Sequence, residues 1–157
     1  MSKDEQGRRL RIILAEDHRT LRGLIRRTLE RDRRFEVIAE TGDGLEAVAL
    51  AGRRLPDVVI LDIRLPGLEG IAATKKIKVG SPSTKVIVMS MHDDAAHIYD
   101  ALAAGASGYV VKSEMDAIAE AVVRVSKGEI YLTPPISLER IESYRQNAGK
   151  PSLQILS

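Results

Sequence analysis

The segment VVILD, residues 58–62, is a run of branched apolar residues that ends on an acid, and three further segments are built alike. They are RIILAED at 11–17, ending on Glu16 and Asp17; VIVMS at 86–90, ending on Ser90; and GYVVK at 108–112, ending on Lys112. In an open α/β sheet, ligands bind outside the carboxyl ends of parallel strands. If these runs are neighbouring strands, their acids, hydroxyl and amine share one pocket.

The alternation of apolar runs with helical patterns predicts the fold class. The expected strands lie at residues 10–15, 35–39, 58–61, 85–89 and 107–111. Repeated strand–helix units give a parallel sheet with right-handed crossovers and helices on both faces. The sequence therefore predicts a three-layer α/β/α fold around a five-stranded parallel sheet.

Start and stop signals locate the connecting helices. Asp43 followed by Glu46 predicts the start of the second helix, and Ser113 followed by Asp116 predicts the start of the fifth. We expect the third helix to begin after Pro66-Gly67 and to end near Gly80. The fourth should begin after Asp93 or Asp94 and end at Gly105, and the fifth should end at Gly128.

The predicted α/β domain spans residues 9–128, after a disordered N-terminus at 1–8. After Gly128 the pattern changes. We expect residues 129–157 to form an extended, proline-punctuated segment, a short amphipathic helix over about 136–145, and a linker with the sequence QNAGKPSLQILS.

Composition narrows the class of protein. The 157 residues include no Cys, which excludes disulfides and thiolate metal sites. No apolar stretch approaches the roughly 18 residues of a membrane span, and the charged start lacks a signal-peptide core. We expect a cytoplasmic protein with no membrane partner. We interpret the seven Arg residues within 19–34 as a solvated helix face rather than a patch for nucleic acid or an acidic partner.

The residue types at the strand ends suit phosphoryl chemistry. Each one alone is compatible with an ordinary turn or surface charge, but their combination at four strand ends favours a common site. Three clustered carboxylates repel one another unless a cation or protons neutralise them, and a hard oxygen-rich site suits Mg²⁺. Beside such an ion, Asp62 can act as a nucleophile toward phosphorus. Lys112 and Ser90 would then contact the phosphoryl oxygens.

With these residues, segment 9–128 resembles the receiver domains of bacterial two-component response regulators. The resemblance implies a flavodoxin-like sheet of order 2-1-3-4-5 and a histidine kinase as phosphoryl donor. It implies these roles: phosphoacceptor for Asp62, Mg²⁺ ligands for Glu16, Asp17, Asp62 and the backbone carbonyl of Arg64, switch hydroxyl for Ser90, phosphoryl contact for Lys112, and switch aromatic for Tyr109.

The stretches LPG at 65–67 and ALAAGASGYVVK at 101–112 resemble the LuxR-type subfamily, whose output domain is a helix-turn-helix. The ending Leu156-Ser157 resembles the border before that domain. The resemblance implies homodimerisation on phosphorylation, and DNA binding only through the absent output domain.

Two departures from the family pattern stand out. Ser113 occupies a position where many receivers have a cis proline, so the isomer of the Lys112–Ser113 peptide is left open. Met91 is bulkier than the small residue often found after the switch hydroxyl, and we expect it to overhang the pocket with Arg64 and His92. Slow water access would then prolong the life of the phosphoryl group.

Two other functions compete with this interpretation. Aspartate-nucleophile phosphatases of the haloacid-dehalogenase type also place Asp after an apolar strand, but they need a second Asp two residues on, where this chain has Arg64. A pseudo-receiver would bind partners without phosphorylation, although the complete set of pocket residues argues against it. We therefore expect a signalling phosphoacceptor rather than an enzyme.

Overall fold

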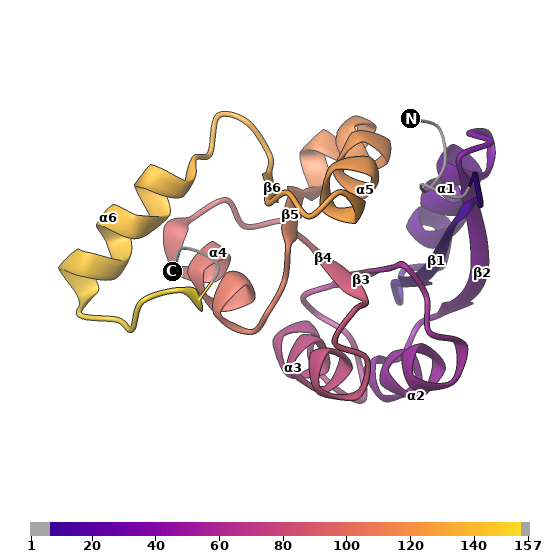
Figure 1. Ribbon diagram of the computed structural model, residues 1–157, viewed down its shortest axis with the longest axis horizontal. Helices are drawn as coiled ribbons and strands as arrows, with labels where there is room; N and C mark the ends of the chain where they lie inside the picture. The colour runs from indigo at the N-terminus through magenta and orange to yellow at the C-terminus, as the bar shows by residue number, and fades with distance from the viewer. Residues whose placement is uncertain (1–6, 155–157) are drawn as a thin grey trace.

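Strands and helices alternate along the chain and form three layers in the computed structural model, which describes residues 7–154 (Figure 1). The strands are β1 Leu10–Ala15, β2 Phe35–Thr41, β3 Val58–Asp62, β4 Lys85–Ser90, β5 Gly108–Val111 and β6 Tyr131–Leu132. The helices are α1 Arg19–Glu30, α2 Gly44–Arg54, α3 Gly70–Gly80, α4 Ala95–Ala103, α5 Ile118–Ser126 and α6 Leu138–Ala148, with a 3₁₀ segment at Lys112–Ala117.

The sheet is parallel throughout and has the order β2-β1-β3-β4-β5-β6. The prediction of five strands is therefore wrong by one, although the first five have the expected order. The extra strand β6 pairs with β5, where the amide of Tyr131 donates to the carbonyl of Ser107 at 2.9 Å. Its two residues, which Thr133 separates from two prolines, are too few to show a strand period in the sequence.

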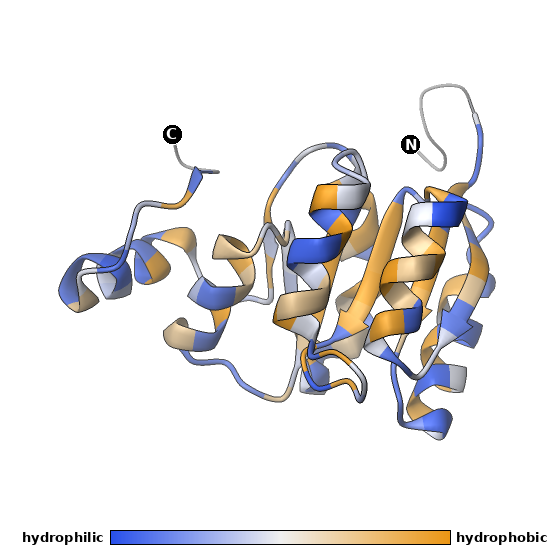
Figure 2. Cartoon of the chain, turned by 90° about the horizontal axis from the view of Figure 1, so that it is seen from below, coloured by the Kyte–Doolittle hydropathy of each residue, from blue (hydrophilic) through white to orange (hydrophobic). Residues whose placement is uncertain are grey.

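Alternate residues of each central strand point to opposite faces of the sheet and supply two cores. Ile13, Val59 and Leu61 pack toward α2, α3 and α4, whereas Ile12 and Ile60 pack toward α1 and α5. Burying one such side chain contributes about 1.5–3 kcal/mol. Figure 2 shows the hydrophobic residues concentrated in the strands, whereas the helices carry both hydrophobic and hydrophilic residues.

Capping residues fix several helix boundaries. Asp43 accepts a hydrogen bond from the amide of Glu46 at 3.0 Å, and Asp94 accepts one from the amide of His97 at 3.3 Å, so both predicted starts are confirmed. Gly105, with φ of 110°, follows α4 in the left-handed region as expected. The fifth helix starts later than expected, because residues Lys112–Ala117 form a 3₁₀ segment that is kinked at the non-helical Glu114, and α5 begins at Ile118.

The C-terminal segment packs against α4 (Figure 1). Ile141 of α6 is fully buried, and Leu153 is nearly so. The hydroxyl of Tyr99 donates to the carbonyl of Pro151 at 2.7 Å. The expected helix near 136–145 therefore exists, but the expected linker from Gln146 begins inside α6 and continues in contact with the domain. The division at residue 128 stays a prediction.

Residues 1–6 of the predicted disordered N-terminus, and the ending Leu156-Ser157, lie outside the described residues. Between residues 7 and 154, no helix is both long and apolar enough to cross a lipid bilayer.

Candidate phosphoryl site at the strand ends

Lys112 joins two of the predicted acids at the carboxyl end of the sheet. Its ammonium nitrogen Nζ lies 2.6 Å from Oδ2 of Asp62 and 3.0 Å from Oε1 of Glu16. The three residues stand at the carboxyl ends of β1, β3 and β5. These ends lie at one edge of the sheet because the strands are parallel and in register: Asp62 of β3 pairs with Met89 of β4, and Ser90 of β4 pairs with Val111 of β5. The structure thus brings together residues up to 96 positions apart in the chain.

Backbone groups hold the two carboxylates in place. The amide of Arg64 donates to Oδ1 of Asp62, and the amide of His18 donates to Oε2 of Glu16, each at 3.0 Å. A close backbone approach follows Asp62, since a side-chain carbon at Gly70 would lie 2.4 Å from the Asp62 carbonyl oxygen. Glycine at position 70 therefore allows α3 to start directly beside the end of β3.

Burial and hydrogen bonding act in opposite directions on the pKa values of Glu16 and Lys112. Burial raises the pKa of the Glu16 carboxyl above its usual value, despite the opposing hydrogen bonds from His18 and Lys112. Burial tends to lower the pKa of Lys112, but its contacts with Asp62 and Glu16 outweigh this and raise the pKa. One ammonium thus stabilises two neighbouring carboxylates.

The acids fit a hard divalent cation. Glu16, Asp17 and Asp62 each offer a carboxylate oxygen, and these oxygens lie within 4.8 Å of one another. Oε1 of Glu16 is buried and has no hydrogen bond of good geometry, only the ion pair with Lys112. Asp17 is exposed, so the cluster opens to solvent on one side. A set of oxygen donors with room for water suits Mg²⁺.

Ser90 and Tyr109 meet at the backbone of His92. Oγ of Ser90 accepts a hydrogen bond from the His92 amide at 3.0 Å, and the Tyr109 hydroxyl donates to the His92 carbonyl at 2.8 Å. Both side chains are fully buried, and burial raises the pKa of Tyr109 to about 12. The tyrosine ring therefore lies inside the fold, under the loop that follows β4.

A cavity of about 240 Å³ opens beside Asp62. It is lined by Asp62, Ile63, Arg64, Ser90, Met91, His92 and Lys112. The three residues expected to overhang the pocket are therefore all present at its wall, with Met91 72% exposed. The Lys112–Ser113 peptide is trans, since the cis bond among residues 7–154 is Pro134–Pro135.

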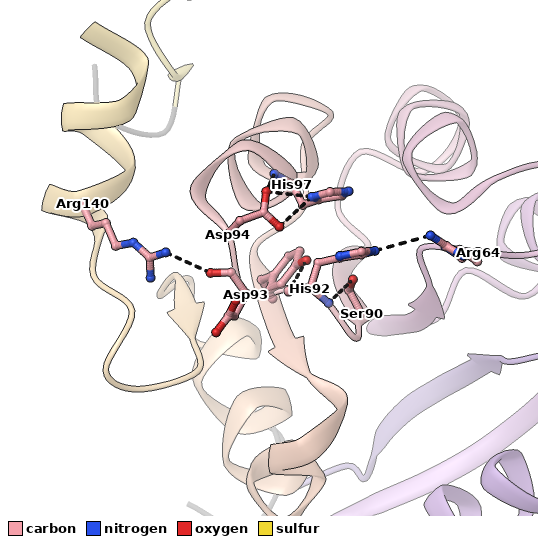
Figure 3. A network of polar contacts seen from close by, with 8 residues as sticks. Arg64, Ser90, His92, Asp93, Asp94, His97 and Arg140 are labelled. Atoms are coloured by element: carbon pink, nitrogen blue, oxygen red, sulfur yellow. Dashed lines mark hydrogen bonds and ion pairs between the residues drawn. The ribbon is translucent and has the colours of Figure 1, made fainter. Parts of the chain in front are cut away.

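A second polar cluster, which the sequence did not lead us to expect, lies on this loop and the first turn of α4 (Figure 3). His92, Asp94 and His97 offer ligand atoms within 4.8 Å of one another, and the two imidazole rings stack with centroids 4.1 Å apart. The spacing His-x-Asp-x-x-His was the available signal.

Comparison with known proteins identifies the family. The model of the response regulator receiver domain matches residues 12–123. The transcriptional regulatory protein DegU of Brevibacillus brevis is 35% identical over 147 residues, which cover 93% of this chain and 62% of DegU. The nitrate/nitrite response regulator protein homolog of Haemophilus influenzae is 33% identical, with 92% and 70% covered. This chain thus spans about two thirds of the length of these relatives.

Solved structures agree. A LuxR-family two-component response regulator from Aurantimonas sp. SI85-9A1 superposes with a TM-score of 0.80 at 34% identity, covering 88% of this chain and 99% of that one. The receiver domain of the NarL regulator from Mycobacterium tuberculosis gives 0.74 at 33% identity, with 77% and 98% covered. The chain belongs to the response regulator receiver domain family, and its relatives include two-component regulators of the LuxR family.

Proposed function

We propose that Asp62 accepts a phosphoryl group from a histidine kinase and that the resulting change in the β4–α4 loop controls dimerisation. The observation that carries this proposal is the placement of the Asp62 carboxylate, which lies between the ammonium of Lys112 and the amide of Arg64, beside two further acids. Such a kinase uses ATP, so we place the protein in the cytoplasm.

In the proposed transfer, a carboxylate oxygen of Asp62 attacks phosphorus while the P–N bond of the donor phosphohistidine breaks. The imidazole leaves with the electron pair of that bond and takes up a proton from water. Lys112 is already within ion-pair distance of Asp62, so it would contact the new phosphoryl oxygens without a large movement. The products are an aspartyl phosphate and a free histidine.

Glu16, Asp17 and Asp62 would hold Mg²⁺, with the backbone carbonyl of Arg64 as a further ligand. When bound, the ion would offset the repulsion between the carboxylates and the incoming anion. The closeness of the three carboxylates supports this assignment, because their oxygens lie within 4.8 Å of one another and repel unless positive charge balances them. Lys112 forms ion pairs with two of these acids, Glu16 and Asp62.

Ser90 and Tyr109 would transmit the effect of phosphorylation to the surface of the domain. Ser90 now accepts from the His92 amide, and it would turn its hydroxyl toward the phosphoryl oxygens. That movement would shift His92, whose carbonyl accepts the hydrogen bond of Tyr109. A nearly complete switch requires about 5.5 kcal/mol of preference for one state. A few charge-assisted hydrogen bonds of about 1.5–3 kcal/mol each can supply it.

The output would be homodimerisation of this domain. In longer relatives of the LuxR type, we propose that the dimer positions a helix-turn-helix on DNA. Receiver domains are signalling phosphoacceptors rather than ordinary enzymes. Arg64 supports the same role here, since it occupies the position where a phosphatase of the haloacid-dehalogenase type needs an acid for the leaving group.

Intact mass spectrometry after incubation with acetyl phosphate and Mg²⁺ tests the proposal. We expect one labile phosphoryl adduct on the unmodified chain and on Asp116→Asn, an acid outside the pocket, but none on Asp62→Asn. Omitting Mg²⁺ should strongly reduce labelling. Absence of an adduct on the unmodified chain would favour a pseudo-receiver, and an adduct on Asp62→Asn would place the phosphoryl group elsewhere.

A further inference from the structure

The loop between β4 and α4 is held from two sides. On the inner side, Ser90 accepts the amide of His92, and Tyr109 donates to the carbonyl of the same residue. On the outer side, the guanidinium of Arg140, which belongs to α6, donates to the carbonyl of Asp93 at 3.2 Å (Figure 3). The phosphoryl site and the C-terminal helix therefore contact two consecutive residues of one backbone segment.

The packing of α6 fixes the position of Arg140. Ile141, the next residue, is fully buried where α6 packs on α4. The rings of Tyr99 on α4 and Tyr144 on α6 lie with their centroids 6.0 Å apart. Ser137 caps the helix by accepting the amide of Arg140 at 3.3 Å. The guanidinium thus reaches the loop from the first turn of a docked helix.

An ordinary surface contact is the simplest alternative explanation of this hydrogen bond. Arg140 is exposed, and one such bond adds little to the stability of the fold. Its location is what distinguishes it, because it ties together residues 47 positions apart at the loop that leads into α4. Asp94, directly after the bonded carbonyl, is the N-cap of α4.

The proposed movement of Ser90 determines the direction of the coupling. When its hydroxyl turns toward the phosphoryl group, the amide of His92 loses its present acceptor, and the backbone at His92 and Asp93 shifts. The bond from Arg140 depends on the distance and direction of the Asp93 carbonyl, so the shift weakens it. By linkage, a contact that favours the unmodified loop opposes the phosphorylated state to the same degree.

We propose that Arg140 is a positioning residue of the phosphoryl switch: docked α6 holds the β4–α4 loop in its unmodified conformation, and phosphorylation of Asp62 loosens α6 from the loop. The direction of this coupling rests on the proposed function, whereas the hold of Arg140 on the loop does not. The C-terminal helix is thereby both a restraint on the switch and an element that responds to it.

Hydrogen exchange followed by mass spectrometry tests both parts on the full chain. Without any phosphodonor, peptides covering residues 91–98 should exchange faster in Arg140→Ala. Beryllium fluoride with Mg²⁺ should speed the exchange of α6 in the unmodified chain but not in Asp62→Asn. Loss of the restraint should also lower the half-saturating concentration of beryllium fluoride in Arg140→Ala by roughly 2–10-fold, the range for one hydrogen bond.

Two variants separate positioning from mere support of the helix. Arg140→Lys keeps a donor and should restore both loop exchange and the half-saturating concentration. Lys150→Ala removes an exposed cation of the same C-terminal segment and should match the unmodified chain. A purely structural role would change the exchange of α6 without changing the affinity for the mimic.

The proposal is overturned if Arg140→Ala matches Lys150→Ala in loop exchange or in affinity for beryllium fluoride. It is also overturned if the mimic leaves the exchange of α6 unchanged in an unmodified chain that acetyl phosphate labels. Failure of the proposed function has a different signature, because acetyl phosphate would then leave no adduct on the unmodified chain.

Discussion

Tyr109 is buried, and its hydroxyl donates to a backbone carbonyl of the loop above it. Its pKa of about 12 lies above the ordinary value of 10, so the folded state resists ionisation of the phenol. Stability from this group is complete below pH 10 and is lost as the pH rises toward 12. We expect the free energy of unfolding to fall by about 1.4 kcal/mol between pH 9 and pH 11 because of Tyr109 alone.

Urea unfolding at the two pH values measures this effect. Tyr109→Phe lacks the ionisable group and should show a loss smaller by that amount, whereas Tyr144→Phe should behave like the unmodified chain. Equal losses in Tyr109→Phe and Tyr144→Phe would show that the Tyr109 hydroxyl ionises as freely in the folded state as in the unfolded state.

Met91 stands at the wall of the cavity beside Asp62 and is largely exposed. If its side chain restricts the approach of water to the aspartyl phosphate, Met91→Ala should speed dephosphorylation several-fold. The rate is measured by loss of the phosphoryl adduct over time. Val79→Ala, which trims an exposed apolar residue on α3, is the control. A Met91→Ala rate equal to that of the control would contradict the slow-access hypothesis.

At the scale of elements, α6 packs on α4 through one face, which carries its buried side chain. Ile141 is the buried residue of this helix, and Tyr99 reaches the segment beyond it through Pro151. Replacing a buried Ile by Ala typically costs about 2–5 kcal/mol. We expect Ile141→Ala to release α6 locally, because the helix lies outside the sheet and its contacts concentrate at one face.

Hydrogen exchange followed by mass spectrometry checks this expectation. Peptides covering α6 should exchange much faster in Ile141→Ala, while peptides covering β1 and β3 should keep their protection. Glu139→Ala changes an exposed residue of the same helix and should leave exchange close to that of the unmodified chain. Slowed or unchanged exchange in α6 of Ile141→Ala would mean that other contacts hold the helix.

Local sequence signals predicted the elements that depend on local physics. Asp43, Asp94 and Gly105 mark helix ends because caps and left-handed turns act within a few residues. The pairing of Tyr131 with Gly108, and the contact of Tyr99 with Pro151 across 52 residues, depend on tertiary packing that no period in the sequence reports.

The site was predictable for a related reason. Strand ends fall level in a parallel sheet, so Glu16, Asp62 and Lys112 could be placed together before their distances were known. The stacking of His92 on His97 was not predictable, because it depends on the path of a loop rather than on strand register.

At the scale of the whole molecule, phosphorylation should change the state of association. We expect beryllium fluoride with Mg²⁺, which mimics the phosphoryl group, to shift the chain from monomer toward dimer. Size-exclusion chromatography with light scattering gives the mass directly. Asp62→Asn should stay unshifted under the same conditions. Equal masses with and without the mimic would count against dimerisation as the output.

The strand β6 has a consequence for how this domain can be shortened. β5 carries the apolar sequence GYVV, and β6 together with the Thr133 hydroxyl, which accepts from the Val111 amide at 3.0 Å, occupies its outer hydrogen-bonding groups. A chain ending at Gly128, where the sequence alone would end the domain, would leave that row of groups unpaired. Unpaired apolar edge strands recruit strands from other molecules. Such a truncated chain should therefore aggregate. Residues 129–133 thus protect the domain against misassembly by covering the edge of β5.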